Sequence, residues 1–159
     1  MKKITVREIM KLSPCDRYNI FTVFKLIKFG KTPLEILDLD IPKNDKFWVL
    51  LRPNYIPIKQ LHLLACDFAQ EVAYLNSDPR VQAAIDSKRL WIDGKITDEE
   101  LKIASAAAWV AAATAARAAA WVAAAADAAA ATTAARAADI ETKQIEMIRK
   151  VFIDMEEIK

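Results

Sequence analysis

The feature that most constrains this chain is an alanine-rich run from Ala104 to Ala138. Neither glycine nor proline interrupts the run. Alanine has the highest helix propensity, because its side chain loses no conformational entropy in a helix. A straight helix over the run would be roughly 50 Å long. Because alanine buries little apolar area, such a helix needs neighbouring helices that approach its backbone closely. The run therefore predicts the inner member of a helical bundle.

The 159 residues predict a single all-α domain, a compact multi-helix bundle built around the Ala-rich segment. Within it we expect a basic helical part over 1–55 and a helical bundle over 56–159, with an Ala-rich helix over 98–138. Residues 1–55 contain eleven Lys or Arg against six Asp or Glu, although the whole chain carries only +2. This imbalance fits a solvated surface or contact with an acidic partner. The overall charge gives no signal for nucleic acid.

Capping signals and glycines predict where the helices begin and end. Thr5 can cap a helix to about residue 12, and Ser13-Pro14-Cys15-Asp16 has the pattern of a second helix start. The sequence Thr97-Asp98-Glu99-Glu100 is a capping box that begins the Ala-rich helix. Gly30 and Gly94 fit the left-handed position after a helix. The expected helices cover 5–12, 13–29, 32–40, 44–51, 57–75, 78–93 and 97 onward.

Two of these assignments leave alternatives. Residues 47–51 also fit a buried strand, but helix is preferred because no partner strand is evident. From Thr97 to Lys159 nothing forbids helix, and one continuous helix would be roughly 90 Å long. A domain of this size cannot cover such a rod, so we predict a break, first at Thr132-Thr133 and next at Ala113-Thr114. The alternative is a long rod covered by other copies of the chain.

The cysteines and the single histidine leave few catalytic arrangements. Cys15 and Cys66 lie far apart within helical patterns, which predicts reduced, buried thiols rather than a disulfide or a metal site. His62 is the only histidine, which argues against histidine-based metal sites and a Ser-His-Asp triad. We expect it half-buried on a helix flank. The sequence thus predicts no catalytic residue, no metal and no cofactor.

The candidate site consists of the bulky and charged residues of the Ala-rich run: Trp109, Arg117, Trp121, Asp127 and Arg136. The preferred interpretation is packing, with the tryptophans filling gaps and the charges facing solvent. The second is a pocket in which Trp109 and Trp121 stack on a nucleotide-like ligand and an arginine binds its phosphate. Ice binding is disfavoured, because the threonines lack an eleven-residue period.

No membrane partner is expected, because the Ala-rich run does not suit a membrane span. Arg117 and Asp127 lie within it, and each charge costs about 2.5–3.5 kcal/mol near the centre of a bilayer. The N-terminal lysines are not followed by an apolar run, so no signal peptide is predicted. We therefore expect a cytoplasmic protein, in the host cytoplasm if a phage encodes it.

Residues 61–138 resemble a known family. The residues that carry the resemblance are Ala65-Cys66, Glu71-Val72, Asp78-Pro79-Arg80, Ala84-Ile85, Arg89, Trp91, Gly94 and Thr97. They precede the Ala-rich helix in a pattern similar to the immunity protein family, a group of Ala-rich helical domains of bacteria and phages. Relatives often carry histidines in the Ala-rich part, and this sequence has none there.

The resemblance implies an all-helical domain that acts in conflict between phages and bacteria. We expect a non-enzymatic binding protein that neutralises a protein effector of defence or sequesters a nucleotide-like signal. One alternative is a structural or assembly protein that forms homo-oligomers through the Ala-rich helix. Another is an immunity protein against a toxin, and a small hydrolase ranks after these. A nucleic-acid partner is not expected.

Overall fold

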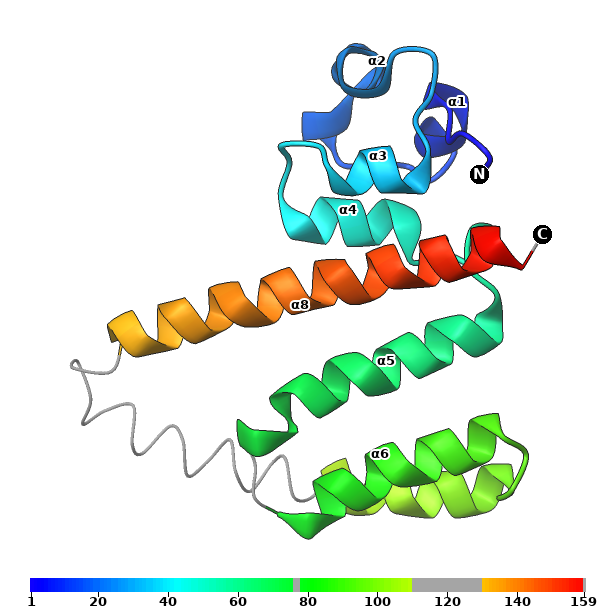
Figure 1. Cartoon of the computed structure of the whole chain (residues 1–159), viewed down its shortest axis with the longest axis vertical. Coiled ribbons are helices and arrows are strands. Elements are labelled where there is room, and N and C mark those ends of the chain that lie inside the picture. Colours follow the sequence, from blue (N-terminus) through cyan, green and yellow to red (C-terminus); the bar gives the residue numbers. More distant parts are fainter. Residues whose placement is uncertain (76–77, 110–129, 159) are drawn as a thin grey trace. The chain divides into compact units, whose positions relative to one another are not determined.

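The computed structural model describes residues 1–75, 78–109 and 130–158 (Figure 1). The described part is all-α, as predicted, apart from an isolated antiparallel bridge between Ile4 and Lys31. The elements are α1 (Val6–Met10), a 3-10 turn (Asp16–Tyr18), α2 (Ile20–Ile27), α3 (Pro33–Leu37), α4 (Lys43–Leu50), α5 (Ile58–Val72), a second 3-10 turn (Ala73–Leu75), α6 (Pro79–Ile92), a helix over 98–109, and α8 (Ala130–Glu157). No described helix is both long and apolar enough to cross a bilayer.

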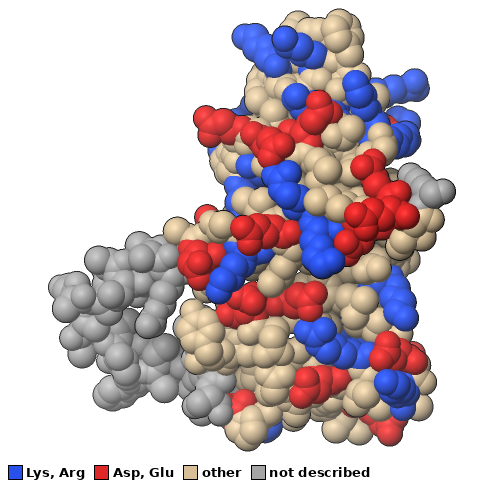
Figure 2. All heavy atoms as spheres, viewed as in Figure 1, with Lys and Arg blue, Asp and Glu red and all other residues tan. Residues whose placement is uncertain are grey.

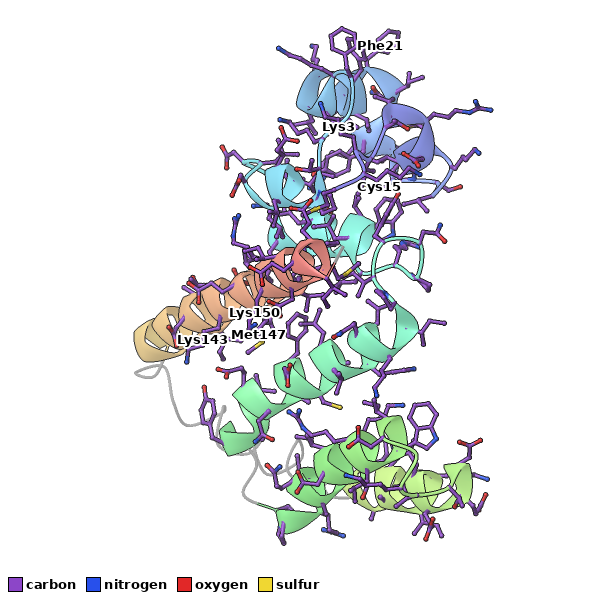
Figure 3. All side chains as sticks on the ribbon, turned by 45° about the vertical axis from the view of Figure 1, so that its right-hand side comes forward. Lys3, Cys15, Phe21, Lys143, Met147 and Lys150 are labelled. Carbon is purple, nitrogen blue, oxygen red and sulfur yellow. The ribbon has the colours of Figure 1, made fainter. Side chains whose placement is uncertain are left out.

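The chain forms two compact units, of which the first contains residues 1–57 and 145–159. Its helices α1 to α4 are short, and the last turns of α8 lie beside α4 (Figures 1 and 3). Ile148 and Phe152, one turn apart on α8, are buried. Arg149 Nη2 on the same helix donates to Asp38 Oδ1 at 2.5 Å. The buried apolar residues of this unit are Ile4, Ile9, Val23, Ile27, Ile36, Leu37, Val49, Leu50, Ile56, Ile148 and Phe152.

The second unit contains residues 58–144. In it α5 and α6 run antiparallel, so residues late in α5 contact residues early in α6. Three pairs show this: the amides of Gln70 and Gln82 bond each other, Arg89 Nη2 donates to Asp67 Oδ1 at 2.8 Å, and the rings of His62 and Trp91 lie 5.3 Å apart. Lys143 of α8 forms an ion pair with Glu71 of α5 at 3.4 Å.

Capping boxes begin three of the helices. The backbone N–H groups of Thr5, Thr32 and Thr97 each donate to the glutamate three residues later, at 2.7–2.8 Å. Each threonine hydroxyl accepts from the backbone N–H of that glutamate at 3.3 Å. Glu8 also accepts from Lys2 Nζ at 2.9 Å, and the bonds from Lys2 and Thr5 lower the pKa of Glu8 to about 2. The predicted starts at these threonines are confirmed.

The expected helix over 13–29 begins later than predicted. Ser13 has a φ of +54°, and its N–H donates to the carbonyl of Met10, so it closes the turn after α1 rather than beginning a helix. Asn19 caps α2 instead, because its Oδ1 accepts from the backbone N–H groups of Phe21 and Thr22 at 3.1 and 3.0 Å. Helix α2 also ends earlier than predicted, at Ile27, where Lys28 with a φ of +47° closes the helix; Gly30, with a φ of +102°, lies in the turn that follows.

Two further predictions about helix bounds are wrong. The fourth helix begins at Lys43 after Pro42, not at Asn44 or Asp45, although the preference for helix over strand is confirmed. Helix α8 runs through Thr132-Thr133 without a break, since two threonines weaken a helix by only a few tenths of a kcal/mol each. The alternative break at Ala113-Thr114 lies outside the described residues.

Candidate functional site

The residues predicted to form a stacking site lie on and around the Ala-rich run. Trp109, on the helix over 98–109, is 77% exposed. Arg117, Trp121 and Asp127 lie outside the described residues, and Arg136 lies on α8. The predicted pairing of tryptophans with arginines therefore stays a prediction.

A different candidate site lies within the first unit. A pocket of about 510 Å³ opens among α1, α2, α3, α4 and the segments that join them. Buried side chains of Val23, Ile27 and Ile36 form part of its wall, whereas Ser13 and Cys15 are exposed at its edge. The lining residues are Ile9, Ser13, Pro14, Cys15, Tyr18, Val23, Leu26, Ile27, Ile36, Leu39, Ile41, Asn44, Asp45, Trp48 and Val49.

The lengths of the helices explain why this space is left. Helices α1 and α3 are five residues long, and α2 and α4 are eight. Each of them buries at most three residues, so few side chains are available to fill the middle of the unit. Ser13 has a left-handed backbone conformation and Cys15 an extended one. Both residues line the pocket where α1 is joined to the 3-10 turn.

One side of the pocket is polar, and its groups bond each other. Tyr18 Oη donates to Asp45 Oδ2 at 2.7 Å, and Arg17 Nη2 donates to the same oxygen at 2.8 Å. Burial and then the hydrogen bond to Asp45 raise the pKa of Tyr18 to about 12, so the phenol stays protonated at neutral pH. Asp45 is the only charged residue of the lining. The ion pair with Arg17 balances the charge of Asp45, so the lining favours an uncharged apolar ligand.

The thiols and the histidine lie in different surroundings. Both cysteines are free, with Cys66 buried and Cys15 exposed, so the prediction of a buried Cys15 is wrong. Its position before a 3-10 turn, not within a helix, places it at the surface. Burial raises the pKa of the Cys66 thiol. His62 is half-buried on α5, as expected.

Acidic and metal-ligating side chains do not gather in the described part of the chain. Within 1–75, 78–109 and 130–158, no three His, Cys, Asp or Glu residues lie close enough together to hold a metal ion. The acidic side chains Glu8, Glu35 and Glu100 instead cap helices. The apolar pocket is therefore the site that the described residues support best.

Sequence reasoning did not find this pocket. Its lining comes from residues 9–49, where the sequence shows only apolar positions with helical spacing. Such positions indicate a core, and nothing in their order shows that the core stays open. The signal to look for is a stretch with more large apolar residues than its short helices can bury against one another.

Comparison with family models, with curated proteins and with solved structures finds no match to this chain. The similarity of residues 61–138 to the immunity protein family therefore stays a prediction.

Proposed function

We propose that this chain is a non-enzymatic binding protein whose first unit takes an apolar ligand into the pocket between α1 and α4. The observation that carries the proposal is the pocket itself, about 510 Å³ with a mostly apolar lining. Sites for small molecules have volumes of about 300–1,000 Å³, apolar walls and a few polar groups that orient the ligand. Tyr18, Asn44 and Asp45 are the polar groups of this kind here.

The charged residues at the pocket restrict the chemical class of ligand that it can bind. The phosphates of a nucleotide need a cationic partner, whereas Arg17 beside the lining is already paired with Asp45. We therefore assign an uncharged apolar ligand to the pocket. Sequestration of a nucleotide-like signal stays linked to Trp109, Arg117 and Trp121. Neutralisation of a defence effector, or of a toxin, follows from the family resemblance alone.

Fluorescence titration with N-phenyl-1-naphthylamine, a neutral apolar dye, tests the proposal. The variant Leu39→Trp fills part of the lining, and it should weaken dye binding at least about tenfold, the equivalent of about 1.4 kcal/mol. Leu90→Trp is the matched control, because Leu90 is 40% exposed on α6 and lies outside the lining. Circular dichroism and urea unfolding show whether both variants remain folded.

Two results would contradict the proposal. One is a wild-type protein that does not bind the dye. The other is equal dye binding by the wild type and a folded Leu39→Trp variant. Native mass spectrometry of the purified protein adds an independent measurement, because a retained small molecule appears directly as added mass. Catalytic turnover of such a molecule would refute the non-enzymatic part.

A second candidate function is assembly of copies through the Ala-rich region. The observation that favours it is the exposure of Ile103 (65%) and Trp109 (77%) on the helix over 98–109. Light scattering after size exclusion tests it with Trp109→Ala. A homo-oligomer that becomes a monomer in this variant supports assembly, and a wild type that is already monomeric refutes it.

A further inference from the structure

Helix α2 exposes several large apolar side chains. Val23 and Ile27 are buried, but Phe21 is 75% exposed and Phe29, two residues beyond the helix, is 89% exposed. Figure 3 shows Phe21 pointing away from the rest of the first unit. With Ile20 and Phe24, which are about half exposed, these side chains form a continuous apolar surface. We call these four residues the apolar tip.

Two phenylalanines of the apolar tip, Phe24 and Phe29, contact each other. The rings of Phe24 and Phe29 meet edge to face with centroids 6.4 Å apart. Contiguous exposed apolar surface of this kind marks an interaction site on most proteins, since water solvates it poorly. Something with an apolar interior is therefore expected to cover the apolar tip.

Four lysines lie around the apolar tip, and two of them, Lys3 and Lys31, interact electrostatically with Glu35 of α3. Lys3, Lys25 and Lys28 are exposed and Lys31 is half-buried, and none of them forms an ion pair with a described residue. The sequence from 17 to 34 contains no Asp or Glu. Figure 2 shows Lys and Arg side chains gathered around the apolar surface at this end of the first unit.

A hollow next to Phe29 adds to the basic character of this surface. It measures about 290 Å³ and is lined by Lys3, Lys28 and Lys31 together with the backbone turn at Gly30. The three lysines line this hollow beside Leu26 and Phe29, a mixture that suits the phosphate of a lipid headgroup. The hollow adjoins the apolar tip at Phe29. A partner that fits both has anionic groups at its surface and an apolar interior.

We propose that the apolar tip and its lysines dock the first unit on the surface of an anionic membrane. Protruding phenylalanines flanked by lysines are the composition of interfacial anchors, in which rings enter the acyl boundary and ammonium groups meet the headgroups. An acidic protein partner is less suited, since the exposed rings of Phe21 and Phe29 need an apolar phase beside the anionic groups. The docking is independent of the pocket and goes beyond the proposed function.

This docking differs from the membrane span that the sequence argued against. That expectation concerned the charges of Arg117 and Asp127 inside the Ala-rich run. Helix α2 has eight residues, less than half the length that crosses a bilayer. It would lie at the surface, held by both apolar insertion and charge.

Co-sedimentation of the full chain with lipid vesicles tests the proposal. Vesicles of phosphatidylcholine with about 30% phosphatidylserine should bind the protein, and vesicles of phosphatidylcholine alone should bind it at least about tenfold less. About 1 M NaCl, which shortens the Debye length to about 3 Å, should release most of the bound protein.

Two double variants separate the apolar and the charged contributions. Phe21→Ser with Phe29→Ser, and Lys25→Glu with Lys28→Glu, change exposed side chains and should each reduce binding at least about tenfold. Ile103→Ser and Lys102→Glu are matched controls on exposed positions of the helix over 98–109, and they should stay within about twofold of the wild type.

Other outcomes would overturn the proposal. The first is no sedimentation with phosphatidylserine vesicles, and the second is equal sedimentation of the wild type and the double variants. If the wild type ignores vesicles but forms an oligomer that the phenylalanine double variant breaks, the apolar tip binds a second copy of the chain instead.

Discussion

Replacing Phe152 with alanine tests how the end of α8 completes the first unit. Phe152 is 2% exposed and lies one turn after the buried Ile148. A buried aromatic side chain removes about 150–250 Å² from water. At about 25 cal/mol per Å² this area corresponds to about 4–6 kcal/mol, an upper estimate because the unfolded chain already buries part of it. Alanine keeps the β-carbon, so we expect Phe152→Ala to lower the free energy of unfolding by about 3–4 kcal/mol.

Urea unfolding followed by circular dichroism measures this loss. With a dependence on urea of about 1–3 kcal/mol per M, a loss of about 3–4 kcal/mol should lower the midpoint by roughly 1–4 M. Ile153→Ala is the matched control, because Ile153 is the next residue on α8 and is 41% exposed. It should cost less than about 1 kcal/mol. If Phe152→Ala costs no more than Ile153→Ala, residues 145–159 are not part of the core of the first unit.

Three further predictions concern thiols, a buried ammonium group and acid. Ellman's reagent should react with one thiol of the native protein, Cys15, and with both thiols only after denaturation, because Cys66 is buried. Rapid reaction of two thiols in the native protein would contradict this. The buried Lys46 Nζ donates to the Leu37 carbonyl of α3 at 2.8 Å, and Lys46→Met leaves that carbonyl without its donor. The variant should therefore lower the free energy of unfolding by about 1–3 kcal/mol in urea titrations. An unchanged urea midpoint would contradict this. The pKa of Glu8 falls from 4.5 to about 2 on folding, so its stabilising effect is complete above pH 4.5 and is lost as the pH falls towards 2. The urea midpoint of Glu8→Gln should therefore depend less on pH in that range than the midpoint of the wild type.

Local signals in the sequence predicted most of the helix starts. The threonines at 5, 32 and 97 and Asp78 satisfy the first backbone N–H groups of their helices from a few residues away. Such bonds depend only on neighbours in the chain, so the pattern is readable. The same holds for Gly30 and Gly94, whose positive φ values are intrinsic to the turns they close.

The errors arose where two local signals competed or where tertiary packing decides. Ser13 and Asn19 can both cap a helix, and the hydrogen bond from Ser13 N–H to Met10 uses Ser13 to close α1. The exposure of Cys15 follows from that turn. The pocket could not be predicted, because its existence depends on how closely α1 to α4 approach one another, and the spacing of apolar residues does not encode that distance.

The apolar tip was also hidden in the sequence. Phe21 and Phe24 have the same helical spacing as core residues, and the sequence does not tell which face of an apolar helix is covered. Val23 and Ile27 are buried, so the phenylalanines lie on the other face. The absence of acidic residues from 17 to 34 was visible, but it acquires meaning only beside the exposed rings.

Methyl NMR of the Ile, Leu and Val side chains during titration with N-phenyl-1-naphthylamine tests the central claim most directly. The lining of the pocket includes Val23, Ile27 and Ile36, so their methyl resonances should shift and saturate with one binding constant. The methyl groups of Leu64 and Ile85 in the second unit should stay in place. Shifts confined to the second unit, or no saturating shifts in the lining, would contradict the account.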